Sequence, residues 1–208
     1  ASRDASLWPL ICPSSGFCCV SGCFSFFCSI FCCYETILCR CFVFIRLNSW
    51  INFELLNVDW GLMFDSLTSI MCCVVSFIST LVHLYSVEYM ANDPHLSRFM
   101  SYLSLFTFFM LILVTSDNFV QMFFGWEGVG LASYLLIGFW YKKPSANAAA
   151  IKAFVVNRVG DLGFMLGIFG IFWLFGTVSI PEILAAAPDK VGSSIGFLGL
   201  RVDTMSLL

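Results

Sequence analysis

The chain has 208 residues, of which 60% are hydrophobic and only 11% are charged, and its mean hydropathy is +0.92. Ordinary soluble domains contain about 45–50% apolar residues, so this composition argues against a soluble protein of this size. A net charge of −3 provides no basic surface and argues against nucleic-acid binding. The sequence therefore predicts an all-α, polytopic transmembrane helix bundle.

The first expected element is one membrane span within the uncharged stretch 5–34. A cleavable signal peptide is the alternative, but no basic region beyond Arg3 precedes the long apolar part. Nine of the 11 cysteines lie in the first 41 residues, and no pair has the C-x-x-C spacing of a metal site. We interpret these cysteines as small apolar side chains, not as metal ligands or a disulfide framework.

Charges return between Glu35 and Asp65, where they are scattered among aromatic and β-branched residues. Part of this segment, RCFVFIRLNSW, alternates loosely and predicts a strand or hairpin at the membrane interface. Trp50 and Trp60 suit the level of the lipid headgroups.

Two spans are expected next, over residues 67–85 and 99–115, with a polar turn at Asn92-Asp93-Pro94 between them. His83 lies near the end of the first of these spans. We interpret it as an interfacial residue in preference to a proton carrier.

The stretch Asn118–Tyr141 is long enough to cross a hydrocarbon core of about 30 Å and contains one charge, Glu127, near its middle. Asp117 precedes this stretch and could cap the helix. Gly125, Gly128 and Gly130 surround Glu127; their order and apolar setting favour close helix packing over a nucleotide loop.

The fifth span is expected over residues 148–175 and contains Arg158 and Asp161, three positions apart and hence on one helix face. We interpret them as an ion pair, in which Arg158 biases the charge of Asp161. Lys152 lies nearer the helix end and is expected to extend towards the interface. Beyond Gly176 we expect a loop with a short interfacial helix and a tail too short and too charged for a sixth span.

Glu127 and Asp161 thus place two carboxyl groups deep in the membrane on consecutive helices. Burial raises the proton affinity of a carboxyl group and a nearby cation lowers it, so such a group can switch between its two forms. Together with Arg158 they make three charged groups, and placing three unpaired charges in the membrane would cost on the order of 8–10 kcal/mol. A purely structural role as hydrogen-bond partners is the alternative, but intramembrane charges usually mark ion pathways.

At these residues the chain resembles a known family, subunit 5 of respiratory complex I (NADH:ubiquinone oxidoreductase). The resemblance is carried by GLMFDSLTSIM, HLYSVEYMANDPHLSRFMSYLSLFTFFMLILVTSDN, GWEGVGLASYLLIGFWY and AAAIKAFVVNRVGDLGF. It covers roughly residues 50–180. It implies an antiporter-like region there, a divergent segment over residues 1–49 with about one span, and a loop and truncated tail over residues 181–208.

The resemblance implies a membrane-arm subunit that contributes a proton half-channel and couples electron transfer between NADH and ubiquinone to proton translocation. It implies Glu127, Asp161 and Arg158 as the residues that translocate protons. The chain itself is expected to hold no metal and no cofactor, with NAD, FMN, iron–sulfur clusters and ubiquinone in partner subunits. A subunit of a multi-subunit cation/proton antiporter and a non-transporting structural membrane subunit are the alternatives.

The resemblance also implies partners and a location: other membrane-arm subunits, the lipid bilayer, and the mitochondrial inner membrane, with the bacterial plasma membrane as the alternative. The head and the tail from about Gly196 do not look like the family, whose chains continue for many more helices. We therefore expect a split gene product, an incomplete sequence or a sequence with misread ends. A lysine partner for Glu127 is expected beyond Leu208, or on a separate chain that carries the rest of the subunit.

Overall fold

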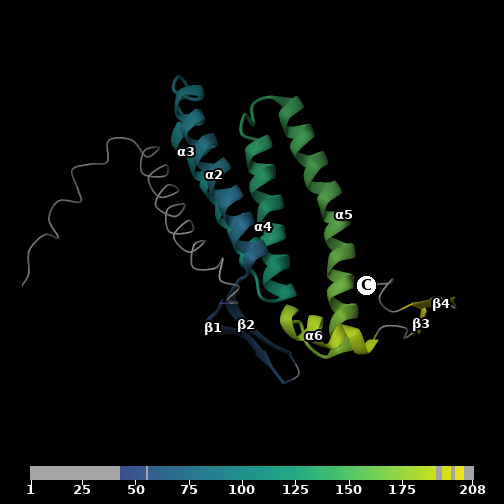
Figure 1. Ribbon diagram of the computed structural model, residues 1–208. Helices are drawn as coiled ribbons and strands as arrows, with labels where there is room; N and C mark the ends of the chain where they lie inside the picture. The colour runs from purple at the N-terminus through teal and green to yellow at the C-terminus, as the bar shows by residue number, and fades with distance from the viewer. Residues whose placement is uncertain (1–42, 55, 191–193, 198–199, 204–208) are drawn as a thin grey trace, which may run out of the picture.

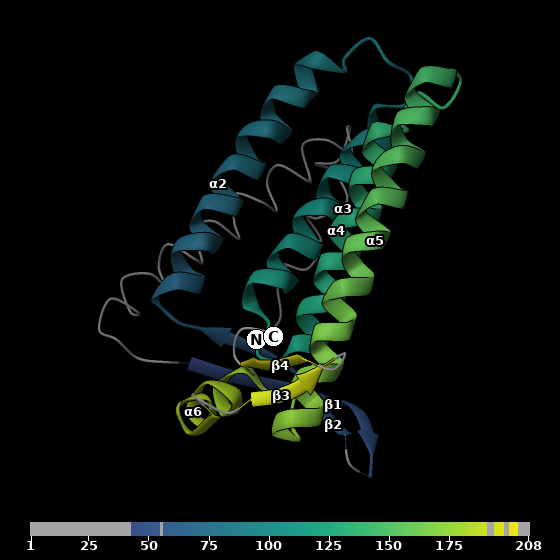
Figure 2. The ribbon, with the colours of Figure 1, turned by 90° about the vertical axis from the view of Figure 1, so that its right-hand side faces the viewer.

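A computed structural model describes residues 43–54, 56–190, 194–197 and 200–203. Four long helices lie side by side, with two small hairpins and a short helix gathered at one end (Figures 1 and 2). The elements in chain order are β1 (Val43–Phe53), β2 (Leu56–Phe64), α2 (Ser66–Tyr89), α3 (Leu96–Thr115), α4 (Phe119–Ile137), α5 (Pro144–Phe175), α6 (Ile180–Lys190), β3 (Ser194–Phe197) and β4 (Leu200–Asp203).

The helices α2, α3, α4 and α5 are each long and apolar enough to cross a membrane. They confirm four of the five expected spans and define a multi-pass membrane protein; the first expected span, within 5–34, lies outside the described residues. Their apolar side chains are mostly exposed, as expected for surfaces that lipid or further helices cover. Helix α6 confirms the predicted short helix near the end of the chain.

The predicted all-α fold class is confirmed for the membrane-spanning part of the described chain, and two antiparallel hairpins, β1–β2 and β3–β4, lie at the ends of the helices. The β1–β2 hairpin confirms the strand predicted from residues 40–50, although it extends further along the chain. Trp50 and Trp60 meet edge to face at 5.0 Å between ring centroids, and both contact Phe124 of α4. These ring contacts fix the hairpin against the end of α4.

Helix α5 begins at Pro144, four residues earlier than the expected span. Proline is well tolerated in the first helical turn because its missing N–H group would have no partner there. The lysine-rich loop is correspondingly shorter. The helix ends at Phe175, and Gly176 is its C-cap. Gly176 has a positive φ of 70°, which glycine adopts readily, and donates its backbone N–H to the carbonyl oxygen of Phe172.

The N-cap of α4 is Asn118, not the predicted Asp117. The Asn118 side chain accepts the backbone N–H of Gln121 at 2.7 Å and donates to the carbonyl oxygen of Asp59 at 2.9 Å. Asparagine can do both because its amide carries an acceptor and a donor, whereas an ionised aspartate can only accept. One side chain therefore caps α4 and ties it to strand β2.

Gln121 makes a second link between α4 and the hairpin. Its side chain is fully buried; it accepts the backbone N–H of Gly61 at 3.2 Å and donates to the carbonyl of the same residue at 2.9 Å. Gly61 is itself buried, so these two backbone groups have no access to water. Paired bonds of this kind hold β2 at a fixed height on α4.

Replacing Gln121 by leucine should detach the hairpin from α4. The buried N–H and C=O of Gly61 would lose their partners, at a cost of about 1–3 kcal/mol each. We expect a lower midpoint of thermal unfolding for Gln121→Leu in detergent. Asn147→Leu is the control, because that more exposed amide also donates to a backbone carbonyl. Equal midpoints for the two variants would contradict a structural role for the Gln121 link.

Glycines allow α3 and α4 to approach closely. A Cβ atom on Gly125 would lie 2.7 Å from the backbone N and Cα of Leu113, and one on Gly128 would overlap the ring of Phe109. Gly130 has more room, since the nearest atom to a Cβ added there would belong to Asn157, at 3.8 Å. The predicted packing role is therefore confirmed at Gly125 and Gly128.

Candidate functional site

The candidate site lies where α4 faces α5, halfway along α4. Glu127 of α4 forms an ion pair with Arg158 of α5, and the guanidinium also lies 3.9 Å from a carboxylate oxygen of Asp161. The side chains of Glu127 and Asp161 are 23% and 10% exposed, and that of Arg158 is 43% exposed. The structure therefore brings all three predicted residues together.

Arg158 contacts Glu127 more closely than it contacts Asp161, which differs from the predicted Arg158–Asp161 pair. The i, i+3 spacing places Arg158 and Asp161 on one face of α5, but a guanidinium is long enough to reach the neighbouring helix. The guanidinium carbon also lies 4.6 Å from the ring centroid of Phe154. Arg158 thus bridges two acids and is held in place by an aromatic ring.

Trp126 is a site residue that the sequence analysis did not select. Its indole N–H donates to a carboxylate oxygen of Asp161 at 2.8 Å, and its ring meets Phe164 edge to face. The bond links the Asp161 carboxylate of α5 to α4, because the indole N–H is a donor and the carboxylate oxygen is an acceptor. The position of Trp126 next to Glu127 is visible in the sequence, but its partner on α5 is not.

A cavity of about 610 Å³ lies beside Asp161 between α3, α4 and α5. Most of its wall is apolar, and its polar lining residues are Trp126, Ser133, Asn157 and Asp161. Such a cavity is large enough for several water molecules. The cavity therefore leaves space beside the Asp161 carboxylate in an otherwise apolar setting.

The charges of this cluster determine what it can do chemically. Two ionised carboxylates and one guanidinium carry a net charge of −1, and the uptake of one proton makes the cluster neutral. Arginine does not release its proton under ordinary conditions, so the carboxyl groups of Glu127 and Asp161 are the members of the cluster that are chemically able to take up a proton. Both acids contact the same cation, so the three side chains form one connected cluster.

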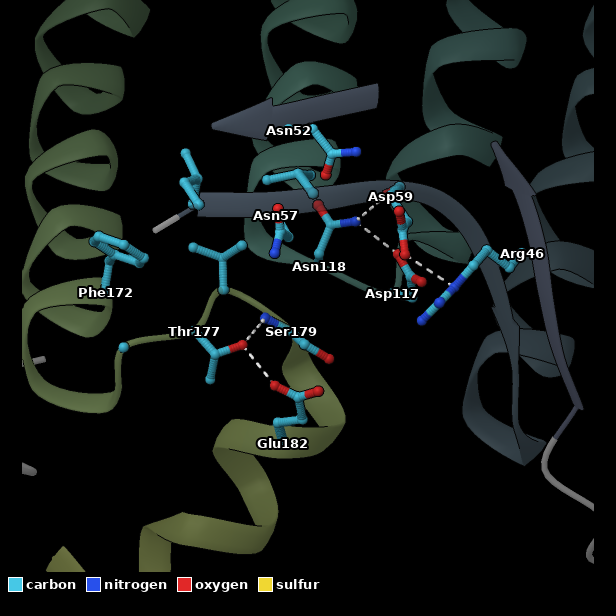
Figure 3. Close-up of a pocket in the computed structure, with 14 residues that line it drawn as sticks. Arg46, Asn52, Asn57, Asp59, Asp117, Asn118, Phe172, Thr177, Ser179 and Glu182 are labelled. Carbon is cyan, nitrogen blue, oxygen red and sulfur yellow. Dashed lines mark hydrogen bonds and ion pairs between the residues drawn. The ribbon is translucent and has the colours of Figure 1, made fainter. Parts of the chain in front are cut away.

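A second, polar cavity of about 530 Å³ lies at the hairpin end of the helices and contains none of the three predicted residues (Figure 3). Arg46 pairs with Asp59 across the β1–β2 hairpin at 2.9 Å, and Thr177 donates to Glu182 at 2.7 Å. Arg46 and Asp59 thus pair within the hairpin, and Thr177 of the loop before α6 binds Glu182 of α6. The cavity therefore lies at the junction of the hairpin, the start of α4 and α6.

Asp117 lies in this cavity beside Asn118, which donates to it at 2.7 Å. Partial burial raises the pKa of Asp117 above its usual value, against the opposing effects of the Asn118 bond and the Arg46 charge. The protonated form of this carboxyl group is therefore more favourable in the folded state than in the unfolded state. Its contribution to stability is largest at low pH and is lost as the pH rises through the raised pKa.

Comparison with known proteins places the chain in a class. Residues 50–100 match the family described as NADH-Ubiquinone oxidoreductase (complex I), chain 5 N-terminus. Residues 116–206 match NADH:quinone oxidoreductase/Mrp antiporter, TM. The chain belongs to this family of antiporter-like membrane subunits.

Within that class, the chain corresponds to the N-terminal part of complex I subunit 5. It is 54% identical over 190 residues to NADH-ubiquinone oxidoreductase chain 5 of Arabidopsis thaliana, with 91% of this chain and 28% of the relative covered. It is 57% identical over 171 residues to NADH-quinone oxidoreductase subunit L of Rhodobacter capsulatus, with coverages of 79% and 24%. The chain thus spans about a quarter of the length of these curated relatives.

Two solved structures share the fold. The Mrp complex from a Dietzia species has a TM-score of 0.69 at 23% identity, over 81% of this chain and 18% of that chain. The archaeal membrane-bound sulfane sulfur reductase has a TM-score of 0.71 at 15% identity, over 84% and 35%. The described part of the chain therefore shares its fold with chains of these two membrane complexes.

The resemblance to the family extends further towards both ends of the chain than the sequence analysis predicted. The second family match reaches residue 206, beyond the expected end of the resemblance near Gly196. A match over 91% of the chain must also include part of residues 1–49. Apolar residues exchange readily where only hydropathy and length matter, so likeness there is hard to recognise in short motifs.

Proposed function

We propose that this chain is the N-terminal part of a membrane-arm subunit of respiratory complex I and contributes a half-channel for protons. The observation that carries the proposal is the cluster of Glu127, Arg158 and Asp161 between two membrane-spanning helices. Two acids that share one cation can take up and release one proton with a small change of geometry. The curated relatives, which are named as subunits of such oxidoreductases, support the same function.

The energy for transport comes from electron transfer between NADH and ubiquinone in partner subunits. We infer that NAD, FMN, iron–sulfur clusters and ubiquinone bind to those partners, and that this chain supplies only the proton path. Partner chains would include other membrane-arm subunits and whatever segment carries the rest of subunit 5. The proposed location is the mitochondrial inner membrane, although a bacterial relative is as similar as the mitochondrial ones.

Arg158 has a defined part in this proposal. Its contact with Glu127 is closer than its contact with Asp161, so Glu127 is its main partner in this arrangement. A cation that approached Glu127 from another helix would compete with this pair and leave Arg158 free to turn towards Asp161. A proton on Asp161 would then be released. This exchange of partners would couple events outside the chain to proton release within it.

An Mrp-type cation/proton antiporter subunit is the second candidate, because it shares the fold and one matched family description names both classes. Two measurements on the tagged chain, purified from its native membrane, separate the candidates. Complex I predicts that redox subunits co-purify and that NADH drives proton translocation in vesicles. An antiporter predicts sodium-dependent proton exchange without NADH. If both activities were absent while the chain was intact, the result would support a structural subunit.

Trp126→Phe tests whether the indole bond to Asp161 matters for transport. The variant keeps an aromatic ring against Phe164 but removes the N–H donor. We expect a fall of about 3- to 10-fold in NADH-driven proton translocation with normal assembly, equivalent to about 1 kcal/mol. Trp173→Phe, at an exposed tryptophan on α5, is the control. Equal rates for both variants would remove Trp126 from the mechanism.

A further inference from the structure

The buried face of α2 is polar along its length. Every α2 side chain that is less than a tenth exposed carries a hydroxyl, thiol or imidazole group: Thr68, Ser69, Cys72, Ser76, His83 and Ser86. Large apolar side chains of the same helix, such as Phe77 and Leu84, are exposed. A helix in a soluble protein has the opposite arrangement. We call this set of six residues the polar face of α2.

His83 is the titratable imidazole on the polar face of α2, and it is only 1% exposed. Its interpretation as an interfacial residue concerns depth in the membrane; the structure adds that the side chain turns inward between α2 and α3. The Nδ1 atom lies 2.8 Å from the backbone carbonyl oxygen of Ser79, and the Nε2 atom lies 3.3 Å from the hydroxyl of Ser104 on α3. Both ring nitrogens thus have partners.

These partners define which proton the ring can exchange. A carbonyl oxygen can only accept, so Nδ1 must carry a hydrogen and donate to Ser79. The Ser104 hydroxyl can either donate to Nε2 or accept from it. The Nε2–Ser104 contact therefore suits a ring nitrogen that accepts from the hydroxyl and one that donates to it, while the Ser79 hydroxyl also lies 3.3 Å from Nδ1.

Hydroxyl groups continue this arrangement along the helix pair. Ser79 Oγ lies 2.7 Å from Thr107 Oγ1, and Thr107 in turn donates to the carbonyl of Leu103. Ser76, one turn before Thr80, is 3% exposed and its hydroxyl oxygen has no hydrogen-bond partner among the described residues. A buried hydroxyl without a partner costs about 1–3 kcal/mol, which a bound water molecule would relieve.

Charged groups are absent from the immediate surroundings of His83 in the described part of the chain. A cavity of about 420 Å³ beside it has uncharged walls contributed by α2, α3 and Leu136 of α4. The charged residues on α2 and α3 are Glu88, which is exposed, and Arg98, which donates to the carbonyl of Phe139. Among the described residues, His83 therefore has no charged side chain as a partner.

We propose that His83 is a second protonatable site in the membrane, separate from Glu127, which exchanges H⁺ at Nε2 through the Ser104 hydroxyl. Hydronium (H₃O⁺) gives a proton to the Ser104 hydroxyl oxygen as the hydroxyl gives its own proton to Nε2, so that the ring gains one proton, water is released and Nδ1 keeps its bond to Ser79. The proposal rests on the α2–α3 contact alone. It does not require Glu127 to translocate protons.

The chain has two histidines, which allows a direct test. His95 is exposed, and His95→Gln leaves His83 as the only histidine. The full chain, labelled with ¹⁵N-histidine and placed in phosphatidylcholine vesicles, is studied by solid-state NMR from about pH 9 to pH 5, which brackets ordinary histidine titration. We expect the Nδ1–H tautomer at high pH and a second N–H signal, at Nε2, on acidification. A single neutral tautomer throughout would overturn the proposal.

The route through Ser104 has its own control. Ser104→Ala removes the hydroxyl next to Nε2, whereas Ser101→Ala removes an exposed hydroxyl that donates to Ser97 on the same helix. We expect the first change to slow exchange of the Nε2 proton with D₂O by about tenfold or more, equivalent to at least 1.4 kcal/mol, and the second to leave it unchanged. Equal exchange rates in both variants would overturn the route.

Discussion

Glu127→Gln should reduce NADH-driven proton translocation by about 100-fold, within the range observed when a proton-transferring group is removed. Glutamine has the shape of glutamate and can still accept a bond from Arg158 through its amide oxygen, so packing against α5 is kept. It cannot take up a proton at ordinary pH. The cluster then holds Asp161 and Arg158 alone, which are neutral together without any proton.

The measurement is the initial rate of proton movement in vesicles that contain the purified complex, together with the rate of NADH oxidation. Glu88→Gln is the control, because Glu88 is an exposed carboxylate on α2. We expect assembly to be normal in both variants and transport to be lost only in the first. Full transport by Glu127→Gln would exclude the proposed role of this carboxyl group.

Gly125→Ala should have the largest effect on stability among single small substitutions. The new Cβ would lie 2.7 Å from backbone atoms of Leu113, and a backbone cannot turn aside as a side chain can. Overpacking of this kind costs about 1–3 kcal/mol, against a gain in helix propensity of up to about 1 kcal/mol. We expect α3 and α4 to move apart and the unfolding midpoint to fall.

Gly167→Ala is the matched control for this change. It makes the same substitution inside α5, where nothing lies within 4 Å of the added carbon. The variant should gain up to about 1 kcal/mol of helix stability and show an equal or higher unfolding midpoint in detergent. If both alanines shift the midpoint equally, close packing at Gly125 is not required.

The spans were predictable because a run of apolar residues with few charges is sufficient to define a membrane helix. The existence of the β1–β2 hairpin was also predictable, from the loose alternation of apolar and polar residues and from the two tryptophans. Boundaries depended on local chemistry instead. Pro144 can begin a helix, and Asn118 replaces Asp117 as the cap because only an amide can also donate to Asp59.

Contacts between helices could not be predicted from spacing within one helix. Arg158 and Asp161 share a face of α5, which suggests a pair, but the rotation of α4 against α5 decides that Glu127 is the closer partner. The bond from Trp126 to Asp161 depends on the same rotation. His83 shows a related limit, because its sequence position near a helix end does not reveal that α3 covers it.

The position of Glu127 halfway along α4 has a consequence for the electrical behaviour of the cluster. Moving one elementary charge across the full transmembrane potential changes the free energy by about 2.3 kcal/mol per 100 mV. A proton that reaches the midpoint of the bilayer crosses about half of that potential, worth roughly 1.2 kcal/mol per 100 mV. Under the proposed function, the proton-binding equilibrium of the Glu127–Asp161 pair should therefore shift about sevenfold for each 100 mV, and the cluster would act as a voltage-dependent proton store.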